Sequence, residues 1–152
     1  MIRVENSTQI DRPVDEVFAY VDDLARLPEW IDILAESVPS ESPTKVGTRV
    51  TNQVRLLRRR FENTLDVVEH DPNRRMVFKT EAPFAVMATF LFEPANGGTS
   101  FTTVLEAQPN ASTFFKLGEP ILTRVGKRRF KGHLRRLKKR LEAQGTRQHQ
   151  AA

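Results

Sequence analysis

The stretch Phe90-Leu91-Phe92-Glu93-Pro94-Ala95-Asn96-Gly97-Gly98-Thr99-Ser100-Phe101 contains two apolar segments separated by a turn signal. An Asn-Gly pair between alternating apolar residues is typical of a tight β-hairpin, because both residues accept the positive φ angles that such a turn requires. The sequence therefore predicts two antiparallel strands that meet at this turn. Their inward rows are Phe84, Val86, Ala88, Phe90 and Phe92 before the turn, and Phe101, Thr103, Leu105 and Ala107 after it.

Strand patterns continue upstream of this hairpin. Apolar and polar residues alternate with a period of two over residues 46–56, 61–67 and 75–80, which predicts half-buried strands. The connections contain Asp71-Pro72-Asn73 and Ala82-Pro83, and such short turns join antiparallel neighbours. Residues 2–10 add a first strand. One apolar face and one polar face indicate a sheet that is packed on one side only.

Helical patterns flank the strands. Asp11-Arg12-Pro13 ends the first strand and begins a helix, and a second short helix is expected around Leu27–Ile31. A long helix is predicted from Pro120 to about Ala143, roughly 36 Å in length and enough to cross the sheet. Its apolar stripe is Leu122, Gly126, Phe130, Leu134, Leu137 and Leu141. We expect an α+β domain over residues 1–144, followed by a disordered polar tail over 145–152.

The composition excludes several classes of protein. The 152-residue chain has no cysteine, so a disulfide framework, a thiolate metal site and a cysteine nucleophile are all excluded. No apolar run approaches the length of a membrane span, and the N-terminus lacks a signal pattern. We therefore expect a soluble cytoplasmic protein. The net charge of +5 is uneven, because residues 1–45 carry −6 and residues 46–152 carry +11.

Several short strings, taken in order, carry a resemblance to a known superfamily. They are Ile10-Asp11-Arg12-Pro13-Val14-Asp15-Glu16-Val17-Phe18, Leu27-Pro28-Glu29-Trp30, Phe90-Leu91-Phe92-Glu93-Pro94 with Gly97-Gly98-Thr99, Gly118-Glu119-Pro120-Ile121-Leu122, and Leu134-Arg135-Arg136-Leu137-Lys138-Lys139-Arg140-Leu141-Glu142. Over about residues 2–143 the chain resembles the START-like (SRPBCC) superfamily of polyketide cyclase/dehydrase and lipid-transport type. The resemblance implies a helix-grip fold, in which an antiparallel sheet wraps around a long C-terminal helix and encloses an apolar cavity.

Two amides stand out on the predicted inner face. Asn52 and Asn63 occupy inward positions among apolar residues, and an unpartnered buried amide costs about 1–3 kcal/mol. Either they hydrogen-bond to a polar ligand group or to pocket water, or they bond to each other across neighbouring strands or lie near a strand end. The expected ligand-binding residues are Trp30, Asn52, Val54, Phe61, Asn63, Phe78, Val86, Phe90, Phe101, Phe130, His133 and Leu134.

The sequence offers little for catalysis. The histidines are His70, His133 and His149, and their spacing matches no metal-binding motif, so we expect no metal and no cofactor. His133 flanks the apolar stripe of the long helix and is the one candidate for an acid or base in the cavity. Aromatic polyketide cyclases of this fold bind their substrate chain with Arg, Tyr and Trp side chains. The inward rows here contain neither Arg nor Tyr, so the resemblance does not establish a cyclase.

Two further features concern entry and partners. Phe114, Phe115 and Leu117 in the 109–118 connection are candidates for a lid over the cavity, and Trp30 is a candidate for its mouth. The alternative is that these residues are hydrophobic caps on the core. Ten basic residues lie between Arg124 and Arg140. They form either a solvated helix face or a surface for an anionic membrane. We do not expect nucleic acid as a partner, because the basic residues are accompanied neither by an element that could read a groove nor by exposed aromatic residues that could stack on nucleobases. The oligomeric state is not encoded in any recognisable pattern.

Three hypotheses therefore stand after the sequence. The first is a binding protein for a hydrophobic small molecule such as a lipid, an isoprenoid or a polyketide-like compound. The second is a cyclase or dehydratase-type enzyme that uses the same cavity, with His133 as the titrating group. The third is an interaction module that works through the basic face of the C-terminal helix.

Overall fold

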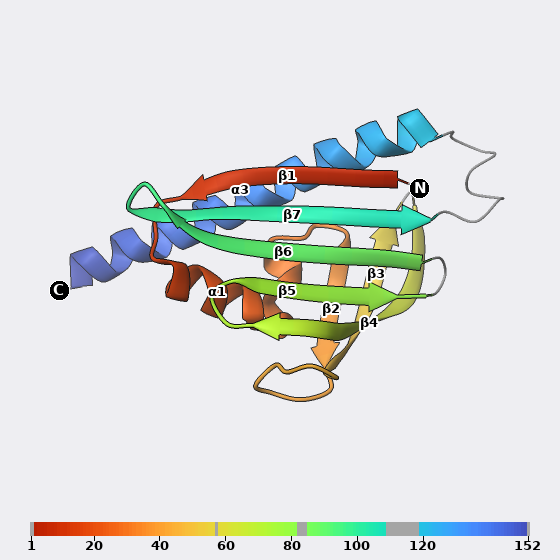
Figure 1. Ribbon diagram of the computed structural model, residues 1–152, viewed down its shortest axis with the longest axis horizontal. Coiled ribbons are helices and arrows are strands. Elements are labelled where there is room, and N and C mark those ends of the chain that lie inside the picture. Colours follow the sequence, from red (N-terminus) through yellow and green to blue (C-terminus); the bar gives the residue numbers. More distant parts are fainter. Residues whose placement is uncertain (1, 57, 82–84, 109–118, 152) are drawn as a thin grey trace.

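The computed structural model describes residues 2–56, 58–81, 85–108 and 119–151 (Figure 1). A strand, two short helices, six further strands and a long helix follow one another in the described part of the chain. The order is the predicted one, but the sequence predicts only five strands after the short helices, and the additional one is the edge strand Leu34–Pro39. The elements are β1 (Ile2–Ile10), α1 (Val14–Asp22), the 3-10 helix η1 (Leu24–Glu29), β2 (Leu34–Pro39), β3 (Arg49–Leu56), β4 (Arg59–Asp71), β5 (Arg75–Thr80), β6 (Ala85–Ala95), β7 (Gly98–Gln108) and α3 (Glu119–Ala151).

The described strands form one sheet of seven, in the order β1-β7-β6-β5-β4-β3-β2, and every neighbouring pair is antiparallel. Strands β2 to β7 make a meander with consecutive strands side by side. The first strand instead pairs with the last one, so that Ile2 lies opposite Ala107 and Ile10 opposite Thr99. The predicted antiparallel meander is confirmed.

The β6–β7 hairpin turns at the expected residues. Asn96 and Gly97 have φ angles of 52° and 79°, which suits a tight hairpin turn. The next residue is glycine for a different reason. A Cβ atom at Gly98 would lie 2.3 Å from the backbone oxygen of Ile10, so no side chain fits where the two strands approach each other.

The two faces of the sheet differ as predicted. On the inner face, Val50 and Val54 are buried in the core on either side of Asn52. On the outer face, Arg49 Nε donates to Asp66 Oδ1 at 2.8 Å, in an exposed pair between β3 and β4. Such an exposed pair contributes little to stability. The fold is therefore stabilised mainly by apolar contacts between the inner face of the sheet and the segments that cover it.

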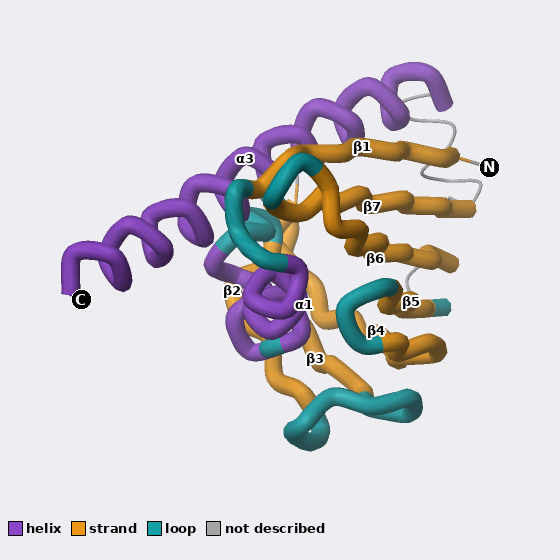
Figure 2. Tube along the Cα trace, turned by 60° about the vertical axis from the view of Figure 1, so that its left-hand side comes forward, coloured by secondary structure: helices purple, strands orange, loops and turns teal. Residues whose placement is uncertain are grey.

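The long helix α3 supplies much of that cover (Figures 1 and 2). It runs alongside β1, and its Leu134, Leu137 and Leu141 are buried in the same core as the sheet residues. Towards its N-terminal half, Asn6 Nδ2 on β1 donates to the Lys127 carbonyl at 3.5 Å. Among the described residues, no helix is both long enough and apolar enough to cross a membrane.

The end of α3 differs from the prediction. The sequence predicted a helix that stops near Ala143 and a disordered tail from Gly145, but α3 continues to Ala151. The apolar stripe does end near Leu141. The residues that follow are mostly alanine, glutamine and arginine, which favour a helix even without a core to pack on, and no proline interrupts them.

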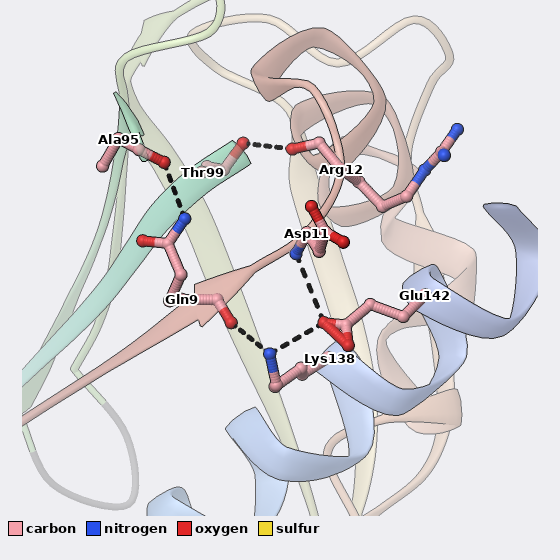
Figure 3. Close-up of polar contacts among 7 residues, drawn as sticks. All are labelled: Gln9, Asp11, Arg12, Ala95, Thr99, Lys138 and Glu142. Atoms are coloured by element: carbon pink, nitrogen blue, oxygen red, sulfur yellow. Dashed lines mark hydrogen bonds and ion pairs between the residues drawn. The ribbon is translucent and has the colours of Figure 1, made fainter. Parts of the chain in front are cut away.

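A set of polar contacts fixes α3 to the far end of β1 (Figure 3). Lys138 Nζ donates to the Gln9 carbonyl and pairs with Glu142 Oε2 at 2.7 Å, and the same Glu142 oxygen accepts from the Asp11 amide at 3.2 Å. Nearby, Thr99 Oγ1 donates to the Arg12 carbonyl at 2.8 Å. The corner between β1 and α1, the start of β7 and the helix are thereby joined at one place.

Removing the buried side chain of Leu137 should weaken this cover. Its side chain is fully buried in the core beneath α3. We expect Leu137→Ala to lower the free energy of unfolding by about 2–5 kcal/mol, because it removes apolar contacts and leaves a cavity. Urea unfolding followed by circular dichroism measures the loss. The control is Arg135→Ala, an exposed position on the same helix, which should change stability by no more than about 0.5 kcal/mol. Equal losses in both variants would contradict the packing described here.

Candidate functional site

The centre of the inner face is aromatic. Trp30, directly after η1, packs against Phe90 of β6 and Phe101 of β7, with ring centroids 5.7 and 6.0 Å apart. Phe78 of β5 lies 5.3 Å from Phe90. The Trp30 side chain is 0% exposed. Of the two alternatives predicted for Trp30, the structure therefore favours the hydrophobic cap on the core over the cavity mouth, since the chain folds back after η1 and brings the indole into the core.

The predicted lining residues fall into two groups. The first is buried in one core cluster and comprises Trp30, Val54, Phe78, Phe90, Phe101 and Leu134. The second is only half-buried and comprises Phe61, Asn63, Val86 and Phe130. The half-buried group, together with Leu65 and Leu105, leaves apolar surface on the inner face that the described residues do not fully cover. The predicted lid residues Phe114, Phe115 and Leu117 lie outside the described residues.

Asn52 and Asn63 lie opposite each other on β3 and β4, but they do not bond to each other. The Asn52 side chain is fully buried, and its Oδ1 accepts a 2.6 Å hydrogen bond from Ser37 Oγ on β2. Its Nδ2 has no partner, and neither has Asn63 Oδ1. Mutual pairing across the strands, the simpler of the two sequence-based interpretations, therefore does not occur.

Four buried polar atoms of the site have no hydrogen-bond partner: Trp30 Nε1, Asn52 Nδ2, Asn63 Oδ1 and His133 Nδ1. Trp30 Nε1 and Asn52 Nδ2 are donors, Asn63 Oδ1 is an acceptor, and His133 Nδ1 is a donor or an acceptor depending on the tautomer. Buried polar groups are almost always paired in folded proteins. Such a set among aromatic and aliphatic side chains is what a site for a partly polar, mainly apolar molecule requires.

His133 is more deeply placed than its position on the flank of the helix suggests. Its side chain is 1% exposed, and its ring lies 4.8 Å from that of Phe130. Nε2 lies 2.7 Å from Oδ1 of Asp32, in the turn between η1 and β2. Arg129 and Arg136 approach the same carboxylate at 3.9 and 4.0 Å. A histidine–carboxylate pair of this kind can accept a proton or hold an imidazole in one orientation.

The sequence analysis did not identify Asp32. This residue lies in a turn, where no periodic pattern shows which way a side chain points, and it is separated from its partner by 101 positions. Charge alone was no guide, because ten acidic residues precede residue 46. Only the fold brings the turn after η1 against α3.

Burial and charge act on this pair in opposite directions. Burial has the largest effect on His133 and lowers its pKa below the ordinary 6.5, although the hydrogen bond and charge of Asp32 act the other way. Burial alone would raise the pKa of Asp32, but the His133 hydrogen bond and the charges of His133, Arg129 and Arg136 outweigh it and lower that pKa. At neutral pH the pair is therefore a neutral imidazole beside a carboxylate.

The titratable residues His70 and Glu62 do not join this site, and the side chain of His149 lies outside the described residues. His70 Nε2 lies 2.8 Å from Asp22 Oδ1 at the end of α1, and its ring packs against Phe18. Glu62, on the outer face as predicted, accepts from Gln53 Nε2 at 2.9 Å. Within the described ranges, no three His, Asp or Glu side chains gather into a metal site.

The basic face of α3 is partly neutralised. Arg129 and Arg136 face Asp32, and Arg140 Nη1 lies 3.3 Å from Glu29 Oε1. Lys138 pairs with Glu142. In the part of the chain that the structure describes, no ion pair is formed by the exposed Lys127, Arg128, Lys131, Arg135 and Lys139.

Together, the antiparallel sheet, the two short helices after β1 and the long helix packed over the apolar face define a START-like helix-grip protein. A family model described as "Polyketide cyclase / dehydrase and lipid transport" matches residues 1–142, so the chain belongs to this family. A search of curated proteins found no match.

Solved structures share the fold at low sequence identity. The protein TTHA0849 from Thermus thermophilus has a TM-score of 0.77 and 18% identity, over 93% of this chain and 97% of that one. A START superfamily protein from Mycobacterium smegmatis has a TM-score of 0.77 and 11% identity, over 93% and 97%. The di-domain aromatase/cyclase StfQ from the steffimycin biosynthetic pathway has a TM-score of 0.75 and 18% identity. The match to StfQ covers 95% of this chain and 52% of that chain, so this chain spans about half its length.

The protonation state of His133 is open to direct measurement. At pH 6.5, where an ordinary histidine is half charged, we expect a neutral His133 that carries its proton on Nε2. Nitrogen-15 NMR of the imidazole distinguishes this state from the other tautomer and from imidazolium. A ring that is half protonated at this pH would contradict the assignment.

The same lowered pKa affects stability in a predictable direction. Below pH 6.5 the unfolded chain takes up a proton at this position before the folded protein does. The free energy of unfolding should therefore fall as the pH decreases from 6.5 towards the lower pKa of the folded state. The His133→Gln variant should lack this component, so the difference between its pH profile and that of the wild type isolates it.

Proposed function

We propose that this protein binds a hydrophobic small molecule that also carries polar groups, held between the inner face of the sheet and α3. The observation that supports it best is the set of unpartnered buried atoms on Trp30, Asn52, Asn63 and His133. Each such atom costs about 1–3 kcal/mol if nothing pairs with it. A ligand that offers hydrogen-bonding groups at these positions recovers that cost.

The half-buried apolar side chains supply the driving force. Phe61, Leu65, Val86, Leu105 and Phe130 all leave part of their surface uncovered on the inner side of the fold. Burying apolar surface gains about 25 cal/mol per Å², so a ligand that covers a few hundred Å² gains several kcal/mol before entropic costs. Membership of a family described by polyketide cyclisation and lipid transport supports the same general function.

Native mass spectrometry of the protein as purified from cells is the first test of binding. We expect a stoichiometric hydrophobic passenger, because the inner face carries half-buried apolar side chains beside buried polar atoms that have no partner. Solvent extraction followed by mass spectrometry then identifies its chemical class. A clean apo mass, together with no thermal stabilisation by a panel of lipids and polyketides, would overturn the proposal.

A pair of variants locates the site. Val86→Trp adds bulk on the half-buried inner face and should weaken binding of the fluorescent probe N-phenyl-1-naphthylamine by roughly tenfold or more. Val38→Trp makes the same change on β2, where the side chain is 52% exposed, and should leave binding unchanged. Equal affinities in both variants would place the ligand elsewhere.

The His133–Asp32 pair favours a second candidate function, a cyclase or dehydratase-type enzyme. Neutral His133 would take a proton from a carbon atom between two carbonyl groups, and the resulting enolate carbon would attack a third carbonyl of the same chain. The new alkoxide recovers the proton from the imidazolium. A second proton abstraction with loss of water then forms the carbon–carbon double bond, and no other reactant is needed. The similarity to an aromatase/cyclase supports this candidate.

The enzyme candidate has its own test. With a poly-β-keto thioester as substrate and ultraviolet absorbance of the aromatic product as readout, His133→Ala should lower kcat by about 10²–10⁴ if the imidazole is the base. KM should change much less, because the apolar contacts remain. Turnover that is the same in wild type and His133→Ala would eliminate this candidate while leaving the binding function intact.

A further inference from the structure

The chemistry of the His133–Asp32 pair fixes which ring nitrogen carries the proton. A carboxylate has only acceptor oxygens, so the 2.7 Å contact between Asp32 Oδ1 and His133 Nε2 requires the proton to be on Nε2. In a neutral imidazole the other nitrogen, Nδ1, is then an acceptor with a free lone pair. This atom is buried and has no partner. What it lacks is therefore a hydrogen-bond donor.

The pair is also held in this arrangement. Arg129 and Arg136 approach Asp32 at 3.9 and 4.0 Å, and favour its charged form. The ring of Phe130 packs edge-on against the imidazole at 4.8 Å. Rotation of the ring would break the hydrogen bond to Asp32 and turn a polar edge into apolar surroundings. The lone pair of Nδ1 is thus presented in a fixed direction.

The other unpartnered atoms of the site restrict the ligand further. Trp30 Nε1 and Asn52 Nδ2 are donors that lack an acceptor, whereas Asn63 Oδ1 is an acceptor that lacks a donor. A hydrocarbon chain satisfies none of these atoms. A hydroxyl group both donates and accepts, so an oxygenated ring compound suits the set where an unsubstituted isoprenoid does not.

We propose that His133 Nδ1 accepts a hydrogen bond from a hydroxyl group of the bound molecule, and that Asp32 is the positioning residue, because it holds the proton of the neutral ring on Nε2 and so leaves the Nδ1 lone pair free and aimed. The inference rests on the proposed binding function and deepens it, because it names the ligand as a hydroxylated, mainly apolar ring compound. Phenolic and enolic hydroxyls fit best, since a more acidic hydroxyl is a stronger donor.

Three probes of matched size test the proposal. They are 2-naphthol, which has a hydroxyl donor, 2-methoxynaphthalene, which has an acceptor only, and naphthalene, which has neither. Isothermal titration calorimetry on the full chain gives the three affinities. We expect the wild type to prefer 2-naphthol over 2-methoxynaphthalene by roughly three- to tenfold, the range of one neutral hydrogen bond.

Variants test whether the His133–Asp32 pair causes the preference for 2-naphthol over 2-methoxynaphthalene. His133→Leu should lose the preference for 2-naphthol and still bind naphthalene. Asp32→Ala should weaken the preference because Nε2 is no longer held, whereas Asp66→Asn, at an exposed carboxylate on the outer face, should keep it.

Lowering the pH should reduce 2-naphthol binding as His133 takes up a proton. The charged groups that act on His133 are Asp32, Arg129 and Arg136. Because Asp32 raises the pKa of His133, this loss should move to lower pH in Asp32→Ala.

The outcomes separate this inference from the function on which it rests. If all three probes bind the wild type equally well, the hydroxyl site is wrong and the binding function stands. If none of the three probes binds, the proposed binding function is contradicted, and so is the hydroxyl site that depends on it. Should His133→Leu not fold, the nitrogen-15 signal of His133 Nδ1 in the wild type decides. A shift on addition of 2-naphthol but not of naphthalene supports the hydrogen bond, and no shift overturns it.

Discussion

An antiparallel sheet with one apolar face is stable in water only when something covers that face, and the rest of this structure follows from that requirement. The cover comes from both ends of the chain. The buried leucines of α3 lie over one side, and the segment that carries Trp30 folds back over the middle. The polar contacts of Lys138 and Glu142 hold the helix against the strand that it covers, so the placement of α3 does not depend on apolar contacts alone.

The same cover places polar atoms where water does not reach them. Trp30 and His133 belong to the two covering segments, and Asn52 and Asn63 to the sheet. A protein that only needed to be stable would be better served by apolar residues at these positions. Their unpartnered atoms are therefore a cost in stability, which the proposed binding of a suitable molecule would offset. Of the exposed basic residues of α3, Arg129 and Arg136 face Asp32 in this site, whereas Lys127, Arg128, Lys131, Arg135 and Lys139 form no ion pair in the described part of the chain. The attraction of this helix face to an anionic membrane stays a prediction, as does a cytoplasmic location.

Much of the fold could be predicted because local patterns encode it. The alternation along β3 to β7 and the Asn96-Gly97 turn follow from period and φ angle alone, and both are confirmed. The site was harder to predict, because its contacts join distant segments. Asp32 meets His133 only after folding, and the hydrogen-bond donor to Asn52 Oδ1 is Ser37 on the neighbouring strand β2, not Asn63. The end of α3 was also mispredicted, for a different reason. The prediction relied on the apolar stripe, which ends near Leu141, but the residues after Gly145 still form a helix.

The pairing of β1 with β7 has a consequence for how the chain is made. Strand β1 leaves the ribosome before its hydrogen-bonding neighbour, residues 98–108, and its helical neighbour α3 follows later still. Until then its backbone groups have only water as a partner. Contacts so distant in sequence carry a large loop-closure cost and slow folding. The meander of β2 to β7 is local and can begin to assemble earlier, so pairing of β1 with β7 follows the first steps of the meander.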